Sequence, residues 1–166
     1  AMAHYIDKKN IDLFVRNGIV SEAEIRARYE IELEHYVKKL HIEALTMIDM
    51  AQKNIAPAVS GFVGKLTETA LAKKSLSAAV SVYAETSLVE ELSDLLEAFV
   101  KKTADLEKAV EDAKKYNGDN LAQATYYREV VFAEMEKLRE LGDSMERKTS
   151  AQYWPYPSYG EILFGV

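Results

Sequence analysis

SLVEELSDLLEAFVKKTADLEKAVEDA, residues 87–113, carries the most regular helical period in the chain. Apolar residues recur there at steps of three and four, which places them on one face of an α-helix: Leu88, Leu92, Leu95, Phe99, Leu106, Val110 and Ala113. Lys102 takes the slot between Phe99 and Leu106 and interrupts this stripe. Ser87 and Glu90 have the spacing of a capping box, which predicts that the helix begins at Ser87.

An even longer stripe lies upstream. Ser21 and Glu24 form another capping-box pattern, and apolar residues then follow at helical spacing: Ile25, Tyr29, Leu33, Tyr36, Val37, Leu40, Ala44, Met47, Ile48, Ala51 and Ile55. Pro57 lacks an amide proton and collides with the carbonyl four residues back. We therefore expect a kink or a brief stop near residues 53–56, with the helix resuming to about residue 74.

Shorter signals complete the helical pattern. A short amphipathic helix is predicted over residues 8–17, ended by Gly18. The serine-rich residues 75–86 are interpreted as a connection, and the turn at 117–120 precedes a last long helix over about 121–148, capped by Asn120. Its apolar stripe is Ala124, Tyr127, Val131, Met135, Leu138, Leu141 and Met145.

These segments predict an all-α fold, an elongated antiparallel helical bundle of three long helices and a short N-terminal one. A helix of about 33 residues is already about 50 Å long. A compact chain of 166 residues has a radius of gyration of only about 15 Å. We therefore expect an elongated molecule. Residues 1–3 are interpreted as a cloning remnant or an edge, 4–152 as the bundle and 153–166 as an extended tail.

Composition narrows the functional classes. The 166 residues carry a formal charge of −6 and no cysteine, which argues against a nucleic-acid partner and removes disulfides and thiolate metal sites. No apolar run approaches the roughly 20 residues that span a bilayer, and no signal peptide is visible. We expect a cytoplasmic protein without a membrane partner.

Candidate catalytic and metal-binding residues are few. Glu32 and His35 form one Glu-x-x-His motif, whereas a ferritin-like di-metal centre uses two. The Gly61–Gly64 stretch lacks a phosphate-loop pattern and is more typical of close helix packing. Tyr127 is expected to point inward, and Arg128 to pair with an acidic residue across the bundle. We expect no catalytic, cofactor-binding or metal-binding residue in this chain.

The C-terminal tail is the most unusual feature. Its two prolines are expected to exclude a helix through residues 153–160, and its aromatic residues are predicted to pack on the bundle or on a larger parent protein. The residues to which we assign this packing or interdomain role are Tyr153, Trp154, Tyr156, Tyr159 and Phe164. A free recognition motif for a partner domain is the alternative.

Three segments together resemble the C-terminal region of bacterial type III glutamine synthetases. They are residues 26–59, beginning RARYE and ending IAPAV, residues 126–132, YYREVVF, and residues 153–164, YWPYPSYGEILF. They occur in the family's order, while residues 60–120 resemble the family in helical character more than in sequence.

The resemblance implies a parent enzyme that joins ammonia to glutamate with ATP and Mg or Mn, assembled as a large double-ring homo-oligomer. It also implies that the nucleotide, metal and glutamate sites lie in an upstream domain, so the fragment itself holds no cofactor. The expected partners are that catalytic domain of the same chain and neighbouring subunits. A free-standing helical adaptor is the alternative, and a ferritin-like metal-binding bundle is a weaker one.

Overall fold

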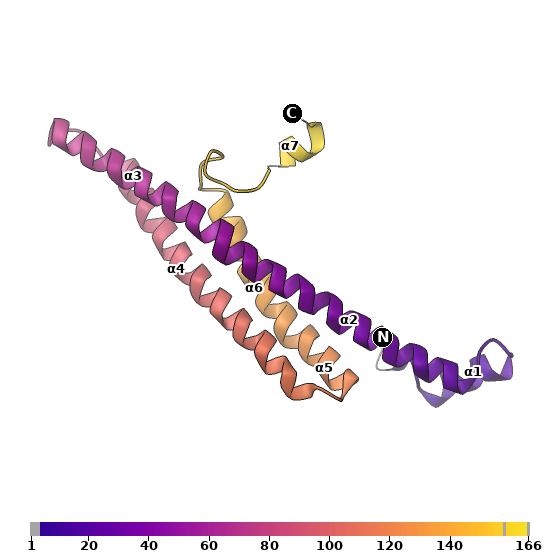
Figure 1. Ribbon diagram of the computed structural model, residues 1–166. Coiled ribbons are helices and arrows are strands. Elements are labelled where there is room, and N and C mark those ends of the chain that lie inside the picture. Colours follow the sequence, from indigo (N-terminus) through magenta and orange to yellow (C-terminus); the bar gives the residue numbers. More distant parts are fainter. Residues whose placement is uncertain (1–3, 158, 166) are drawn as a thin grey trace.

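The computed structural model describes residues 4–157 and 159–165, and Figure 1 shows this part of the chain as helices joined by short connections. The described residues form helices and no strand. The predicted all-α class is therefore confirmed. Residues 1–3, interpreted as a cloning remnant or an edge, lie outside the described residues.

The first two helices begin and end close to where the sequence predicts. Helix α1 spans Lys8–Arg16 and is followed by Gly18, whose φ is +65°. Helix α2 spans Glu22–Met50 and begins at the predicted capping box. The Glu24 amide donates to the Ser21 hydroxyl at 3.3 Å, and the Ser21 amide donates to the Glu24 carboxylate at 2.7 Å. Two otherwise unpaired amides are thereby satisfied.

Of the kink or brief stop predicted near residues 53–56, the stop does not occur, and a local irregularity of the helix lies at residues 51–55. The chain passes from α2 through a π-helical turn, η2 (Ala51–Ile55), into helix α3 (Ala56–Leu76), and Figure 1 shows one continuous helical path. Within the π turn the Ala56 amide donates to the Ala51 carbonyl, five residues back. This wider turn accommodates a proline that has no amide to donate and that would crowd an ordinary α-helical turn.

Helix α4 starts earlier than its capping-box pattern predicts. It spans Tyr83–Asp112, so Ser87 lies one turn inside the helix and caps nothing, and the connection is confined to residues 77–82. The predicted loop over 75–86 is thus wrong at both ends. Tertiary contact with α3 explains the extension, because Lys73 on α3 forms an ion pair with Glu85 in the first turn of α4.

The last long helix is built in pieces. A 3₁₀ turn, η3 (Ala113–Tyr116), ends α4, and helix α5 (Asn120–Tyr126) continues through a second π turn, η4 (Tyr127–Val131), into helix α6 (Phe132–Glu146). Asp119 caps α5 by accepting a bond from the Ala122 amide at 3.0 Å. The predicted Asn120 cap is therefore wrong by one residue.

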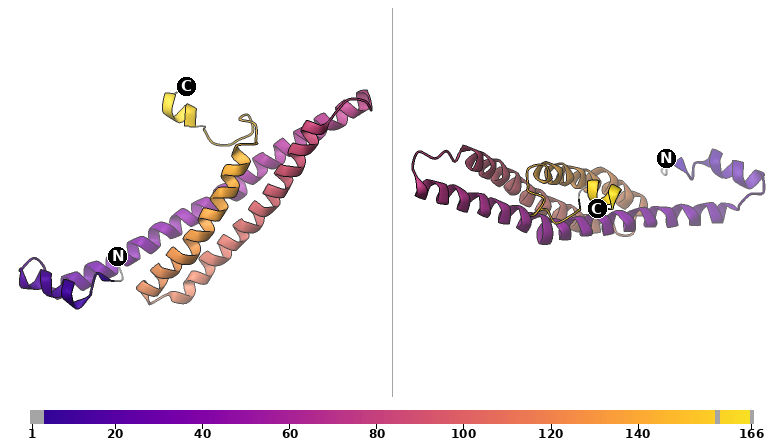
Figure 2. Two further views of the ribbon diagram at one scale, coloured as in Figure 1. Left: turned by 180° about the vertical axis from the view of Figure 1, so that it is seen from behind. Right: turned by 90° about the horizontal axis from the view of Figure 1, so that it is seen from above.

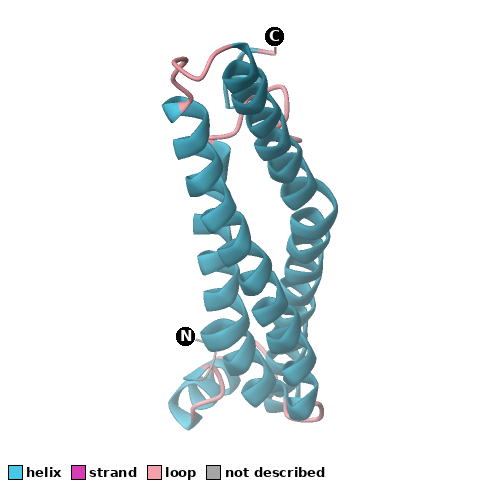
Figure 3. Cartoon of the chain, turned by 90° about the vertical axis from the view of Figure 1, so that its left-hand side faces the viewer, coloured by secondary structure: helices cyan, strands magenta, loops and turns pink. Residues whose placement is uncertain are grey.

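The helices pack along their lengths. Helix α3 lies against α4, α4 against α6, and α2 against α5, and Figures 1 and 2 show an elongated molecule in which the α3–α4 hairpin extends past the end of α6. Figure 3 shows the helices side by side, viewed from one end of that arrangement. The buried core follows the sequence stripes and includes Leu33, Ala44, Val59, Leu92, Phe99, Leu106, Val131, Leu138 and Met145.

Two further features complete the described chain. The C-terminal residues Tyr159–Phe164 form a short helix, α7, so the tail is not extended throughout as predicted. Across residues 4–157 and 159–165, no helix combines the length and the apolar character that a membrane span requires.

Candidate functional site

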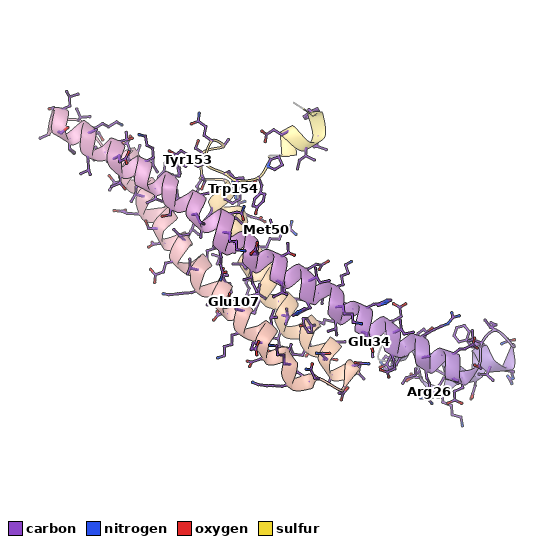
Figure 4. All side chains as sticks on the ribbon, in the orientation of Figure 1. Arg26, Glu34, Met50, Glu107, Tyr153 and Trp154 are labelled. Carbon is purple, nitrogen blue, oxygen red and sulfur yellow. The ribbon has the colours of Figure 1, made fainter. Side chains whose placement is uncertain are left out.

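An apolar groove opens between α2 and α6. It encloses about 430 Å³, and the side chains that line it come mainly from α2, η2, α4 and α6: Met47, Met50, Ile55, Phe99, Met135 and Leu138. Trp154 from the tail also lines it. Figure 4 shows Met50 and Trp154 on neighbouring parts of the fold. The floor of the groove includes buried core residues such as Phe99 and Leu138, and the half-buried Met47 and Met50 lie beside them.

Its shape follows from the two π turns and one glycine. Ala51 and Ile55 of η2 face it, and Met135 follows η4 by one turn. Gly142 of α6 is buried beside Phe99, where an added Cβ would lie 3.7 Å from the aromatic ring. The small Gly142 lets α6 approach α4 beside Phe99, and residues of the first π turn form part of the groove wall.

Charged side chains flank the groove in pairs. On α2, Lys39 lies 3.9 Å from Glu43, and on α6, Arg139 lies 3.7 Å from Asp143. Because each rim charge has a partner of opposite sign, the groove presents no strong net charge. The geometry suits an uncharged, apolar occupant.

The tail turns back onto the helices at residue 150. The amides of Tyr153 and Trp154 both donate to the Ser150 carbonyl, at 2.8 and 3.0 Å. This turn sets the Tyr153 ring against Phe62 of α3, with ring centroids 5.3 Å apart, and brings it within 3.8 Å of the Cβ position of Gly61. Tyr153 and Trp154 are thus half-buried on the helices.

Tyr156 and the residues beyond it differ in their surroundings. Tyr156 is half-buried, and burial, reinforced by the nearby Asp49 carboxylate of α2, raises the pKa of its hydroxyl. The side chain of Tyr159 lies outside the described residues. Phe164 of α7 is 77% exposed, and Ile162 and Leu163 beside it are also exposed. The structure therefore places only part of the tail on this chain's own surface.

Polar contacts join the helices around the core. The Lys102 amine donates to Asp105 at 2.8 Å and to Glu134 of α6 at 2.9 Å, so the residue that interrupts the α4 stripe links two helices. Hydrogen bonds from Lys137 and Lys102 hold the pKa of Glu134 below its ordinary value of 4.5. The Thr103 side chain takes the buried slot instead, with its hydroxyl bonded to the Phe99 carbonyl.

The YYR segment, residues 126–128, crosses from the end of α5 into η4 and packs among the helices. Tyr127 points inward, as predicted, and its hydroxyl lies 2.9 Å from Nδ1 of His41 on α2. Burial, and secondarily Tyr126, raises the pKa of the Tyr127 hydroxyl. Tyr126 packs on Tyr116. Arg128 is exposed and forms no ion pair with the described residues, so its predicted partner across the helices is absent there.

Metal binding finds no support in the described part of the chain. Glu32 and His35 are both exposed on α2. Among residues 4–157 and 159–165, no cluster of three or more His, Cys, Asp or Glu side chains could hold a metal ion. The described residues do not fit the divalent metal that the resemblance implies for the parent, and we assign it to none of them.

Sequence reasoning missed the groove itself. It placed Met47 and Met135 in helical stripes and predicted that the long helices bury these stripes against each other, without locating a groove. The available signal was the repeated spacing of four around residues 44–59 and 127–135, which an α-helix cannot keep on one line.

Comparison with known proteins shows which family the chain resembles. Residues 1–74 match the glutamine synthetase C-terminal domain. Over 171 residues the chain is 36% identical to a glutamine synthetase from Butyrivibrio fibrisolvens, and over 176 residues it is 31% identical to the type-3 glutamine synthetase of Dictyostelium discoideum. The chain is thus similar to the C-terminal domain of glutamine synthetases over residues 1–74, and to glutamine synthetases over nearly its whole length. The resemblance to type III enzymes stated from the sequence is thus confirmed.

The matches cover nearly all of this chain but only a small part of each relative. The matches span 99% of this chain but only 23% of each relative, as does a 27% identical match to the glutamine synthetase of Bacteroides fragilis strain YCH46. The chain thus corresponds to less than a quarter of the curated relatives' length.

Proposed function

We propose that this chain is a non-catalytic helical bundle domain that supports the subunit architecture of a glutamine synthetase. The parent would join ammonia to glutamate with ATP and a divalent metal, and this domain would contact the parent's catalytic domain and neighbouring subunits. The observation that carries the proposal is the apolar groove, with the partly docked tail at its end. Such exposed apolar surface marks an interaction site.

Two observations support an assembly role over a free-standing adaptor. The chain matches its relatives along nearly its whole length while covering only 23% of theirs. Its tail uses Tyr153 and Trp154 to pack on this chain and leaves the apolar residues of α7 exposed. A segment anchored at one end and apolar at the other is suited to joining two bodies.

The test is a pair of truncations in the full-length glutamine synthetase that contains this chain. Removing residues 153–166 should weaken oligomer assembly, measured by sedimentation, or glutamine formation. Removing only 159–166 keeps Tyr153 and Trp154 on the helices and serves as the folding-safe variant, which should weaken the same property. Normal assembly and turnover in both truncated enzymes would refute the proposal.

A second measurement addresses catalysis directly. The isolated chain, supplied with ATP, glutamate, ammonia and Mg²⁺, is expected to form no glutamine. Turnover that persists through further purification would contradict the non-catalytic assignment.

A further inference from the structure

A second, more polar pocket lies where the tail leaves α6. It encloses about 430 Å³ and is lined by residues from the end of α6, from the turn that follows and from α7, among them Glu146, Thr149, Trp154 and Tyr156. Figure 1 shows this turn joining α6 to α7. We call it the tail pocket. Trp154 lines both the tail pocket and the apolar groove, but in the tail pocket it stands beside a carboxylate and a hydroxyl.

The Glu146 carboxylate has no counterion among the residues that the structure describes. Glu146 is half-buried at the last position of α6. The basic residues that follow it are engaged elsewhere, because Arg147 donates to the Ser144 hydroxyl at 3.5 Å and Lys148 forms an ion pair with Glu91 of α4 at 2.7 Å. The carbonyls at the end of a helix add partial negative charge. A cation bound here would therefore meet two favourable electrostatic contributions.

The Thr149 hydroxyl also lacks a partner. Thr149 lines the tail pocket and is 8% exposed, and its Oγ1 is buried with no hydrogen bond to any described residue. The Thr149 amide donates to the Met145 carbonyl at 2.9 Å, which fixes the residue just beyond α6. Buried hydroxyls are nearly always hydrogen-bonded, and one left unpaired costs free energy. A ligand with an N–H donor would supply the missing bond.

Aromatic side chains complete the wall. The rings of Trp154 and Tyr156 line the tail pocket, and Glu161 of α7 adds a second carboxylate, while none of the described residues that line it is basic. An anion would be repelled by the carboxylates, and a neutral apolar group would leave the Glu146 charge uncompensated. An ammonium ion pairs with a carboxylate but is strongly hydrated and compact. A guanidinium is planar, stacks on aromatic rings and carries several N–H donors.

We propose that the tail pocket binds a guanidinium group, the cation that arginine carries. The Glu146 carboxylate accepts N–H bonds from it, the Thr149 hydroxyl accepts another, and the rings of Trp154 and Tyr156 pack against its plane. This site is independent of the proposed assembly function. Free arginine derivatives and an arginine side chain of the parent offer the same chemistry, and the last experiment below distinguishes these two sources.

Titration of the chain with Nα-acetyl-arginine amide tests the site. Binding is followed through the fluorescence of the sole tryptophan, Trp154, and independently through its indole N–H resonance. Both signals should saturate together. Nα-acetyl-citrulline amide, which has nearly the same shape and no charge, should bind about tenfold more weakly or less, as expected for loss of a charged hydrogen bond. Absence of saturable binding, or equal binding of the two probes, would overturn the proposal.

Two substitutions that remove the same charge locate the probe. Glu146→Gln keeps the size of the side chain and should weaken binding of the arginine probe by about tenfold or more. Glu43→Gln is the matched control, because Glu43 lines the apolar groove that Trp154 also contacts. It should leave the affinity unchanged. Equal losses in the two variants, or a loss confined to Glu43→Gln, would contradict binding in the tail pocket.

Thr149→Val tests the hydroxyl with little change of shape. The free chain should be at least as stable as the unmodified one, because an unpaired buried hydroxyl is removed. Affinity for the arginine probe should nevertheless fall by about threefold or more. Urea unfolding and the same titration measure the two effects. An affinity that the substitution leaves unchanged would show that the hydroxyl makes no bond to the ligand and would refute the proposed site.

The full-length glutamine synthetase that contains this chain distinguishes the sources. If an arginine of the parent occupies the tail pocket, the probe should bind the isolated chain and not the assembled parent. If the natural ligand is free in solution, the probe should bind both. Failure of the probe to bind the isolated chain, together with normal dependence of parent assembly on residues 159–166, would overturn the guanidinium site and leave the assembly role standing.

Discussion

At the residue scale, two serines with the same local sequence pattern have different structural roles. Ser21 caps α2 through the reciprocal bonds with Glu24, whereas Ser87 lies inside α4 and caps nothing. The hydroxyl matters only where a helix has unpaired amides at its start. The position of a helix terminus, and not the four-residue motif, decides what such a serine contributes.

This difference predicts unequal effects of the same substitution. Ser21→Ala should lower the free energy of unfolding by about 1 kcal/mol, the usual loss for an N-cap side chain. Ser87→Ala should leave stability unchanged or slightly higher, because alanine is the better helix former. Urea unfolding followed by circular dichroism measures both, and equal losses would show that Ser87 has a capping role after all.

The ion-pair network of Lys102, Asp105 and Glu134 makes a pH-dependent contribution. Glu134 is only 17% exposed, and bonds from Lys137 and Lys102 lower the pKa of its carboxyl. A carboxyl with a lowered pKa in the folded state adds stability above its unfolded pKa, and this stability is lost as the pH falls through the folded pKa.

Glu134→Gln should therefore reduce stability at neutral pH by about 1 kcal/mol, a value typical of a partly exposed charged hydrogen bond. The difference between the variant and the unmodified chain should shrink as the pH falls below 4.5, the ordinary value for this group. Thermal unfolding at several pH values measures it. A difference that stays constant into acid would mean that Glu134 acts through packing instead of charge.

At the element scale, the two π turns keep long stripes aligned with the core. Buried or half-buried residues at 44, 48, 51, 55 and 59 step mostly by four, and each four-residue step on an α-helix advances the stripe by about 40° around the axis. The wider turn at Ala51–Ile55 absorbs this drift. The second π turn, at Tyr127–Val131, also lies where buried residues (127, 131 and 135) are four positions apart.

Deletion of Gln52 tests this account. The deletion should replace the π turn by α-helix and rotate α3 by about 100° relative to α2, which moves the fully buried Val59 away from the core. The melting temperature should fall strongly. Gln52→Ala, which removes only the exposed side chain and its bond to Glu107, is the control and should have a small effect.

Sequence predicted the elements where local pattern and tertiary packing agree. The start of α2 at Ser21 and the inward position of Tyr127 follow directly from capping and periodicity. The start of α4 could not be predicted this way, because contact with α3 through Lys73 and Glu85 extends it to Tyr83. The groove was missed for a similar reason: periodicity identifies an apolar face but does not show whether another helix covers it.

At the scale of the whole molecule, shape is set by one long helical path. The segment from Glu22 to Leu76 is helical throughout and, at about 1.5 Å per residue, spans about 80 Å. The α3–α4 hairpin extends beyond α6, and α1 with the start of α2 extends in the opposite direction (Figure 2). In the middle of the molecule, helices α2, α4 and α6 contact one another.

Solution scattering measures this geometry. A compact chain of 166 residues has a radius of gyration of about 15 Å, and the unmodified chain should exceed this value clearly, because much of its mass lies far from the centre along the rod. The measurement should be made on the monomer fraction isolated by size-exclusion chromatography, so that association between copies does not contribute to the apparent size. A value near 15 Å for that monomer would mean that α2 and α3 fold back on one another at η2. The groove, which depends on η2 continuing the helix past Met50, would then not exist in solution.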